Sequence, residues 1–144
     1  MVEALDVVGV LCVEFFLTIS GELLINETAP RPHNSGHWTI EGARTSQFEQ
    51  HLRAVLDLPL GDTSRTSDWA VMGNILGSSQ SDMFGHYRHL MERLPTLKFH
   101  HYRKGLKDGR KIGHVLLLGW DCDLLDLITD IDYAVDYLNG VANE

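Results

Sequence analysis

Acidic, basic and amide side chains gather in a proline-framed loop that follows an apolar segment. Residues 26–35 read Asn-Glu-Thr-Ala-Pro-Arg-Pro-His-Asn-Ser, which brings a carboxylate, a guanidinium, an imidazole and two amides close together. Pro30 and Pro32 keep this backbone extended and non-helical, so it is stiff enough to preorganise the side chains. Carboxylates bind magnesium, and arginine binds carboxylate, bicarbonate or phosphate as a planar fork. The loop therefore predicts a site for phosphates and metal ions.

Two glutamates interrupt sequence that is otherwise apolar. Glu14 lies within the run 7–17, and Glu27 follows a second apolar run. A tight turn centred on Ser20 and Gly21 places the two glutamates opposite each other in an antiparallel hairpin, where like charges repel. A divalent cation, magnesium for oxygen ligands, removes that repulsion. The alternative is that one glutamate is protonated or faces the surface, or that the register differs by one residue.

Three polar side chains follow the strand that contains Glu27. Arg31, His33 and Asn34 can together hold an anion and move a proton near neutral pH. The alternative is a structural loop in which these groups cap neighbouring backbone. His33 and His37 also raise the question of zinc, but no cysteine or third histidine is placed to complete such a site.

A second candidate site is a basic patch in an acidic chain. The formal net charge of -8 argues against a nucleic-acid surface and against an anionic membrane partner, but not against small anions. The patch between residues 103 and 111 either binds a phosphate or is a solvated hairpin tip. Its members are Arg103, Lys104, Lys107, Arg110 and Lys111.

Local patterns place these side chains on a mixed α and β chain. The 144 residues allow one domain or two small lobes, and the polar stretch 61–68 predicts a boundary. Ser46 and Glu49 match a capping box that starts a helix. The other expected elements are an end of a truncated helix at 1–6, strands at 7–18 and 22–27, an irregular loop at 28–37, an apolar segment at 69–76, a helix at about 81–94, strands at 98–103 and 111–118, and a final helix capped by Asp121.

The cysteines and the first apolar run indicate the compartment. Cys12 and Cys122 lie far apart and have no metal-ligand spacing, so we expect free thiols in a reducing cytosol. The run 7–17 lacks a basic flank and is too short to span a bilayer. We therefore expect a cytoplasmic protein without a membrane partner.

Four sequence blocks, in order, point to one family. They are 9–16, 25–39, 45–51 and the paired segments 102–104 and 109–114. Together they closely resemble the carboxyaminoimidazole ribonucleotide synthases, the ATPase subunits of phosphoribosylaminoimidazole carboxylase, which are ATP-grasp enzymes.

The resemblance implies an α+β fold in two parts. Residues 1–65 would form the C-terminal part of an ATP-grasp lobe, an antiparallel hairpin plus helix, and residues 66–144 a small mixed β/α C-terminal domain. By position, Glu14 and Glu27 resemble magnesium ligands and Asn26 lies beside the nucleotide phosphates. Arg31, His33 and Asn34 resemble the groups that hold bicarbonate or carboxyphosphate, and Lys104, Arg110 and Lys111 resemble those that hold the ribonucleotide phosphate.

The family's reaction, carried over as an implication, joins bicarbonate to aminoimidazole ribonucleotide at the expense of ATP in purine biosynthesis. The lobes that hold most of the ATP in that family have no counterpart in these residues. We therefore expect a chain that is inactive alone, with those lobes on a separate chain as one partner. Apolar strand faces left open predict self-association, and a homodimer is one form of it. The alternative is a non-catalytic remnant or a protein-interaction module.

Overall fold

The computed structural model describes residues 2–77, 83–105, 107 and 109–141. The chain divides into two compact units, Met1–Thr66 and Ser67–Glu144. Both units combine antiparallel strands with helices, which confirms the α+β fold class expected from the sequence. Within the described ranges, no helix has the length and apolar character needed to cross a membrane.

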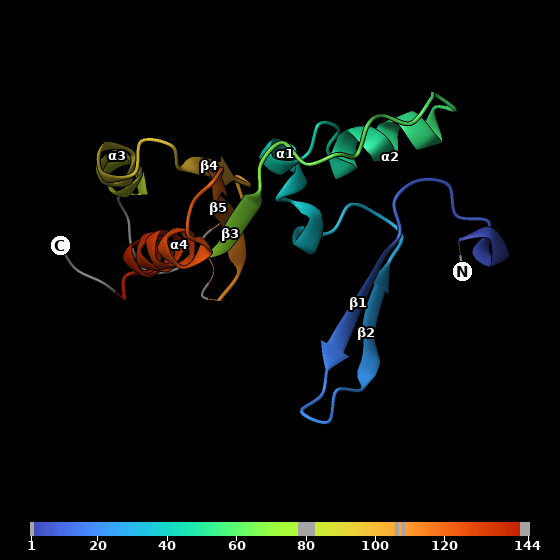
Figure 1. The fold of residues 1–144 in the computed structure, drawn as a ribbon, viewed down its shortest axis with the longest axis horizontal. Helices are drawn as coiled ribbons and strands as arrows, with labels where there is room; N and C mark the ends of the chain where they lie inside the picture. The colour runs from blue at the N-terminus through green and yellow to red at the C-terminus, as the bar shows by residue number, and fades with distance from the viewer. Residues whose placement is uncertain (1, 78–82, 106, 108, 142–144) are drawn as a thin grey trace. The chain divides into compact units, whose positions relative to one another are not determined.

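The first unit contains an antiparallel hairpin, shown in blue in Figure 1. Strand β1 (Cys12–Leu17) pairs with β2 (Leu23–Ala29) and starts five residues later than the predicted strand. The turn is closed by a bond from the Thr18 amide to the Glu22 carbonyl at 2.9 Å. Gly21 has a φ of 84°, a left-handed conformation that glycine adopts without strain.

A β-bulge changes the register halfway along this hairpin. Glu14 pairs with Glu27, as the sequence predicted. The next pair is Phe15 with Ile25, so Asn26 has no strand partner. The half of the hairpin nearer the turn is therefore one residue out of the predicted register, and that part of the prediction is wrong. Bulges of this kind bend a strand and redirect its side chains.

The hairpin leaves its apolar side chains in solvent. Leu17 is 71% exposed and Ile25 is 60% exposed, although both belong to segments apolar enough to be buried. A two-stranded hairpin is marginal alone, and large exposed apolar patches mark surfaces that another surface covers. The open apolar surface expected from the sequence is thus present, on both faces of the hairpin. Its residues are Phe15, Phe16, Leu17, Leu23, Leu24 and Ile25.

Short helical segments follow the hairpin. The segment predicted as an irregular loop contains a 3-10 turn, η2 (Asn34–Gly36), because the His33 imidazole accepts a bond from the Ser35 amide and caps it. A 3-10 turn, η1 (Glu3–Leu5), precedes the hairpin, and a single turn, α1 (Thr39–Gly42), follows η2.

Helix α2 (Gln47–Val55) starts where the capping box predicts. The Ser46 hydroxyl accepts a bond from the Glu49 amide at 3.3 Å. The Glu49 carboxylate extends along the helix and accepts a bond from Arg53 Nε at 3.0 Å. The N-cap half of the predicted capping box is confirmed, with Gln47 as the first helical residue, whereas the Glu49 carboxylate bonds Arg53 rather than the Ser46 amide.

The second unit is a three-stranded antiparallel sheet with two helices. The strand order is β3-β5-β4, and α4 packs on β3 and β5. Core side chains such as Ile112 and Leu138 are fully buried between the sheet and α4. The elements are β3 (Trp69–Leu76), α3 (Met83–Arg93), β4 (Lys98–His101), β5 (Lys111–Gly119) and α4 (Leu124–Asn139).

Two boundaries in this unit differ from the sequence prediction. Strand β4 ends before Arg103, which has a φ of 53° that no strand residue adopts. The last helix is capped by Asp123, whose carboxylate accepts a bond from the Leu125 amide at 2.8 Å. The prediction of Asp121 as the cap is wrong, because Asp121 has a left-handed φ of 46° and the helix begins only at Leu124, directly after Asp123. The predicted start of the helix at residue 81 lies outside the described residues.

Candidate functional site

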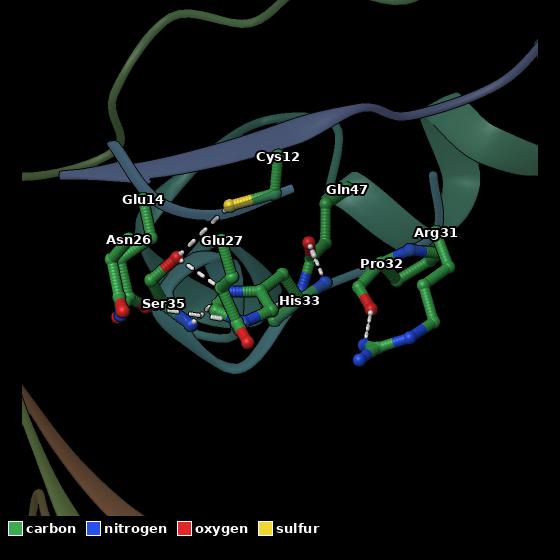
Figure 2. A network of polar contacts seen from close by, with 9 residues as sticks. All are labelled: Cys12, Glu14, Asn26, Glu27, Arg31, Pro32, His33, Ser35 and Gln47. Carbon is green, nitrogen blue, oxygen red and sulfur yellow. Dashed lines mark hydrogen bonds and ion pairs between the residues drawn. The ribbon is translucent and has the colours of Figure 1, made fainter. Parts of the chain in front are cut away.

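Two opposed carboxylates and one buried imidazole form the candidate site of the first unit (Figure 2). His33 Nε2 lies 2.8 Å from Glu27 Oε1 and 4.0 Å from Glu14 Oε2. One ligand atom from each of the three residues lies within 4.8 Å of the other two. His33 is only 8% exposed, whereas the side chains of Glu14 and Glu27 are 40% and 54% exposed. The imidazole therefore backs a pair of carboxylates that solvent can reach.

This donor set fits a divalent cation. Glu14 and Glu27 come from paired positions on neighbouring strands, which is the close like-charge contact that a cation relieves. Oxygen ligands that are open to solvent suit magnesium, which retains water and phosphate oxygens in its shell. Asn26 Nδ2 donates to Glu14 Oε1 at 2.7 Å and offsets part of the charge. The bulge residue thus joins the site through its side chain.

Hydrogen bonds orient the His33 ring. Its Nδ1 accepts a bond from the Ser35 amide and lies 2.9 Å from the Ser35 hydroxyl. In the neutral ring the hydrogen is therefore on Nε2, which donates to Glu27. The Ser35 hydroxyl also contacts Cys12 Sγ at 3.6 Å. Sequence reasoning did not select Ser35 or Cys12, because neither residue type signals a role at these spacings.

The structure does not bring all the predicted residues of this loop to the carboxylates. Arg31 Nη1 donates to the Pro32 carbonyl at 3.0 Å, and in Figure 2 its guanidinium lies apart from the Glu27 carboxylate. Asn34 opens the 3-10 turn directly after His33. Of the residues named from the sequence, the structure brings together Glu14, Asn26, Glu27 and His33.

The basic residues lie in the second unit, in the connection between β4 and β5. Lys104, Arg110 and Lys111 are all exposed. Lys111 begins β5, and Lys104 Nζ lies 5.2 Å from the centre of the Tyr102 ring, a cation–π distance. The three cations are therefore available to an anion from solvent.

A half-buried tyrosine bonded to a buried histidine lies beside this basic connection. The Tyr102 hydroxyl lies 2.6 Å from His114 Nδ1, and the fully buried His114 ring stacks on His100 with centroids 4.5 Å apart. Burial raises the pKa of Tyr102 to about 12. Tyr102 therefore remains a neutral neighbour of Lys104 over the physiological range.

We expect an alkaline loss of stability that depends on Tyr102. The pKa of Tyr102 rises from 10.0 to about 12 on folding, so above pH 10 the unfolded chain releases a proton that the folded chain keeps. Stability should accordingly fall as the pH rises from 10 towards 12. Denaturation at stepped pH measures this, and Tyr102→Phe should reduce the slope, the rest coming from Tyr87, whose pKa burial also raises. An unchanged slope in Tyr102→Phe, or ionisation of all four tyrosines together near pH 10, would contradict the assignment.

Comparison with known families gives the class of the protein. Residues 1–48 match the model of the ATP-grasp domain, and residues 70–126 match that of the phosphoribosylaminoimidazole carboxylase C-terminal domain. The carboxylate pair lies within the first match. The chain therefore contains the end of an ATP-grasp domain followed by this C-terminal domain.

Individual relatives narrow the class to one family. The N5-carboxyaminoimidazole ribonucleotide synthase of Mycobacterium tuberculosis (strain ATCC 25618 / H37Rv) is 54% identical over 124 residues, which cover 84% of this chain and 29% of the relative. That of Corynebacterium ammoniagenes is 50% identical over 144 residues, covering 96% of this chain and 34% of the relative. The chain belongs to the N5-carboxyaminoimidazole ribonucleotide synthase family of ATP-dependent ligases, and it spans about a third of the length of these relatives.

Solved structures agree with this assignment. The phosphoribosylaminoimidazole carboxylase ATPase subunit from Aquifex aeolicus superposes with a TM-score of 0.81 at 41% identity, over 95% of this chain and 40% of that one. The N5-carboxyaminoimidazole synthase from Aspergillus clavatus, solved with ADP and aminoimidazole ribonucleotide, superposes with a TM-score of 0.76 at 36% identity. The match covers 92% of this chain and 35% of that one. The family expected from the four sequence blocks is confirmed.

Proposed function

We propose that this chain supplies the metal-binding and carboxylating portion of an enzyme that joins bicarbonate to aminoimidazole ribonucleotide with ATP. The observation that carries the proposal is the pairing of Glu14 with Glu27 against the buried His33, inside the part that matches the ATP-grasp model. In this proposal residues 1–65 are the end of the ATP-grasp lobe and residues 66–144 the C-terminal domain. Support for the ligands comes from the relative solved with ADP and aminoimidazole ribonucleotide.

Glu14, Glu27 and Asn26 would serve the nucleotide. The two carboxylates would hold magnesium, which when bound offsets the negative charge on the phosphates of ATP. In the structure Glu27 already accepts a bond from His33, and Glu14 accepts one from Asn26. Both glutamates retain a second oxygen for a ligand. The Asn26 amide is placed to turn from Glu14 to a phosphate oxygen.

Arg31, His33 and Asn34 would serve the carboxylation. A bicarbonate oxygen attacks the γ-phosphorus, the bond to ADP breaks, and carboxyphosphate forms. The substrate amine then attacks its carbonyl carbon, inorganic phosphate leaves, and the amine gives up a proton. His33 could take up that proton on Nε2 only after passing the Nε2 hydrogen to Glu27, its hydrogen-bond acceptor, and Arg31 offers a fork for the carboxylate. For that role the Arg31 side chain has to leave the Pro32 carbonyl, its partner in this structure.

Lys104, Arg110 and Lys111 would bind the phosphate of the ribonucleotide. The three cations are exposed on one connection of an otherwise acidic chain, so they concentrate positive charge where an anion has access. The exposed apolar side chains of the hairpin would be covered by further ATP-grasp residues, on the same or another chain. We expect no turnover of ATP by the 144-residue chain alone.

Calorimetry with aminoimidazole ribonucleotide tests the substrate part of this proposal. The chain should bind the ribonucleotide, and Lys111→Ala should weaken binding about tenfold or more, because a charged hydrogen bond contributes about 1.5–3 kcal/mol. Lys98→Ala is the matched control, since Lys98 is an exposed lysine on the neighbouring strand β4. A chain that binds no ribonucleotide, or that loses equal affinity in both variants, would favour the rival function, a non-catalytic remnant or interaction module.

A further inference from the structure

We propose that Gln47 is a positioning residue of the candidate site, which fixes the backbone of His33 and so holds the imidazole against Glu27. The positioning is a property of the folded first unit. Its consequence for carboxylation rests on the function proposed above. Among the contacts drawn in Figure 2, none joins Gln47 to Glu14 or to Glu27.

The Gln47 side-chain amide pairs with both backbone polar groups of His33. Its Oε1 accepts the His33 amide hydrogen at 2.9 Å, and its Nε2 donates to the His33 carbonyl at 2.7 Å. The same Nε2 lies 2.8 Å from His37 Nδ1. Both hydrogens of Nε2 are then used. If the side-chain amide were flipped, Nε2 would face the His33 amide hydrogen and Oε1 would face the His33 carbonyl oxygen, and neither pair can form a hydrogen bond. The amide therefore has one satisfactory orientation, and so has the backbone that it holds.

The backbone around Gln47 is tied to the same loop. The backbone amide of Gln47 donates to Thr39 Oγ1 at 2.9 Å, and the Thr39 hydroxyl donates to the Gly36 carbonyl at 2.6 Å. A Cβ on Gly36 would lie 2.6 Å from Gln47 Oε1, so only glycine leaves room for the side chain there. The side-chain and backbone groups of Gln47 thus connect the start of α2 to the loop that contains η2.

Fixing this backbone matters because the ring of His33 has two rotatable bonds beyond it. Ser35 contacts Nδ1, and Glu27, which is half exposed, accepts from Nε2. With the backbone held, these two contacts select one ring orientation. Without it, the ring would depend on a solvent-accessible carboxylate for its direction.

The chain contains a matched control for this arrangement. Gln50, on the same helix, makes the same two-sided pairing with Gly61: Nε2 donates to the Gly61 carbonyl at 2.8 Å, and Oε1 accepts the Gly61 amide hydrogen at 2.9 Å. Removing either side-chain amide costs two hydrogen bonds to backbone groups, but of the two glutamines only Gln47 bonds His33. A variant of Gln50 therefore shows the effect of lost stability without a displaced His33 ring.

The test is NMR of the histidine ring nitrogens in the 144-residue chain. Gln47→Met should move the His33 ring signals towards those of Glu27→Gln, in which the Nε2 acceptor is weakened. Gln50→Met should lower the unfolding midpoint comparably and leave the His33 signals in place. Unchanged His33 signals in Gln47→Met, or an equal shift in Gln50→Met, would overturn the proposal.

A second variant covers the case in which Gln47→Met fails to fold. Gln47→Glu has the same shape and keeps the acceptor for the His33 amide, but it loses both donors. It should shift the His33 and His37 signals partway, and a wild-type spectrum would refute the positioning role. No nucleotide or ribonucleotide is present in either measurement, so the result is independent of the proposed function. Shifted His33 signals together with an unchanged carboxylation rate, in the chain joined to the rest of a family enzyme, would retain the positioning and reject the catalytic role of His33.

Discussion

Replacing Glu27 with glutamine is expected to slow carboxylation about 100- to 1,000-fold when the chain is joined to the N-terminal portion of a family member. The substitution keeps the shape of the side chain and removes one of the two opposed charges. Loss of one group that stabilises transition-state charge typically has an effect of this size. The magnesium concentration needed for half the maximal rate should rise as well, since the cation loses a charged ligand.

The measurement is ATP consumption that depends on both bicarbonate and aminoimidazole ribonucleotide. Glu22→Gln is the matched control, because Glu22 lies in the hairpin turn, where its amide bonds Thr18. That variant removes the same charge from the same hairpin and should leave the rate within twofold or so of the parent. If Glu27→Gln is as active as Glu22→Gln, Glu27 is not a metal ligand.

Replacing Leu138 with alanine is expected to destabilise the second unit by about 3 kcal/mol. Leu138 is fully buried in the core between α4 and the sheet, and truncating a buried leucine typically costs 2–5 kcal/mol, from the lost burial and from the cavity. The free energy of unfolding from urea titration, followed by the fluorescence of Trp69 and Trp120 in the same unit, measures the loss.

Leu125→Ala is the control for this substitution. Leu125 is on the same helix but is 68% exposed, so its truncation should change the unfolding free energy by less than about 0.5 kcal/mol. Equal small losses would mean that α4 does not bury Leu138. Equal large losses would mean that Leu125 is covered as well, in an interface.

The pairing of the two glutamates was predictable because strand alternation and a glycine-containing turn leave few registers. The register near the turn was not. It depends on the bulge at Asn26, and nothing in the local sequence distinguishes Asn26 from a regular strand residue. The right pair was thus obtained although the predicted pairing of the residues between it and the turn was wrong.

Side-chain-to-backbone contacts were also beyond sequence reasoning. Gln47 bonds a backbone group fourteen positions away, and no periodicity marks such a partner. The cap of the last helix fails for a related reason. Asp121 and Asp123 are both suitable N-cap residue types, and the backbone decides between them: Asp123 is extended, whereas Asp121 has a left-handed φ of 46° that the residue type does not reveal.

The bulge at Asn26 lets strand β2 present two neighbouring polar side chains to one site. Neighbouring residues of a regular strand point to opposite faces, so a strand normally offers every second side chain to a site. Here consecutive residues both reach Glu14, with Asn26 bonded to it and Glu27 paired with it. One irregular position doubles the density of polar groups at that point of β2. Deleting one residue from β2 to restore regular alternation would send either the amide or the carboxylate to the opposite face of the hairpin.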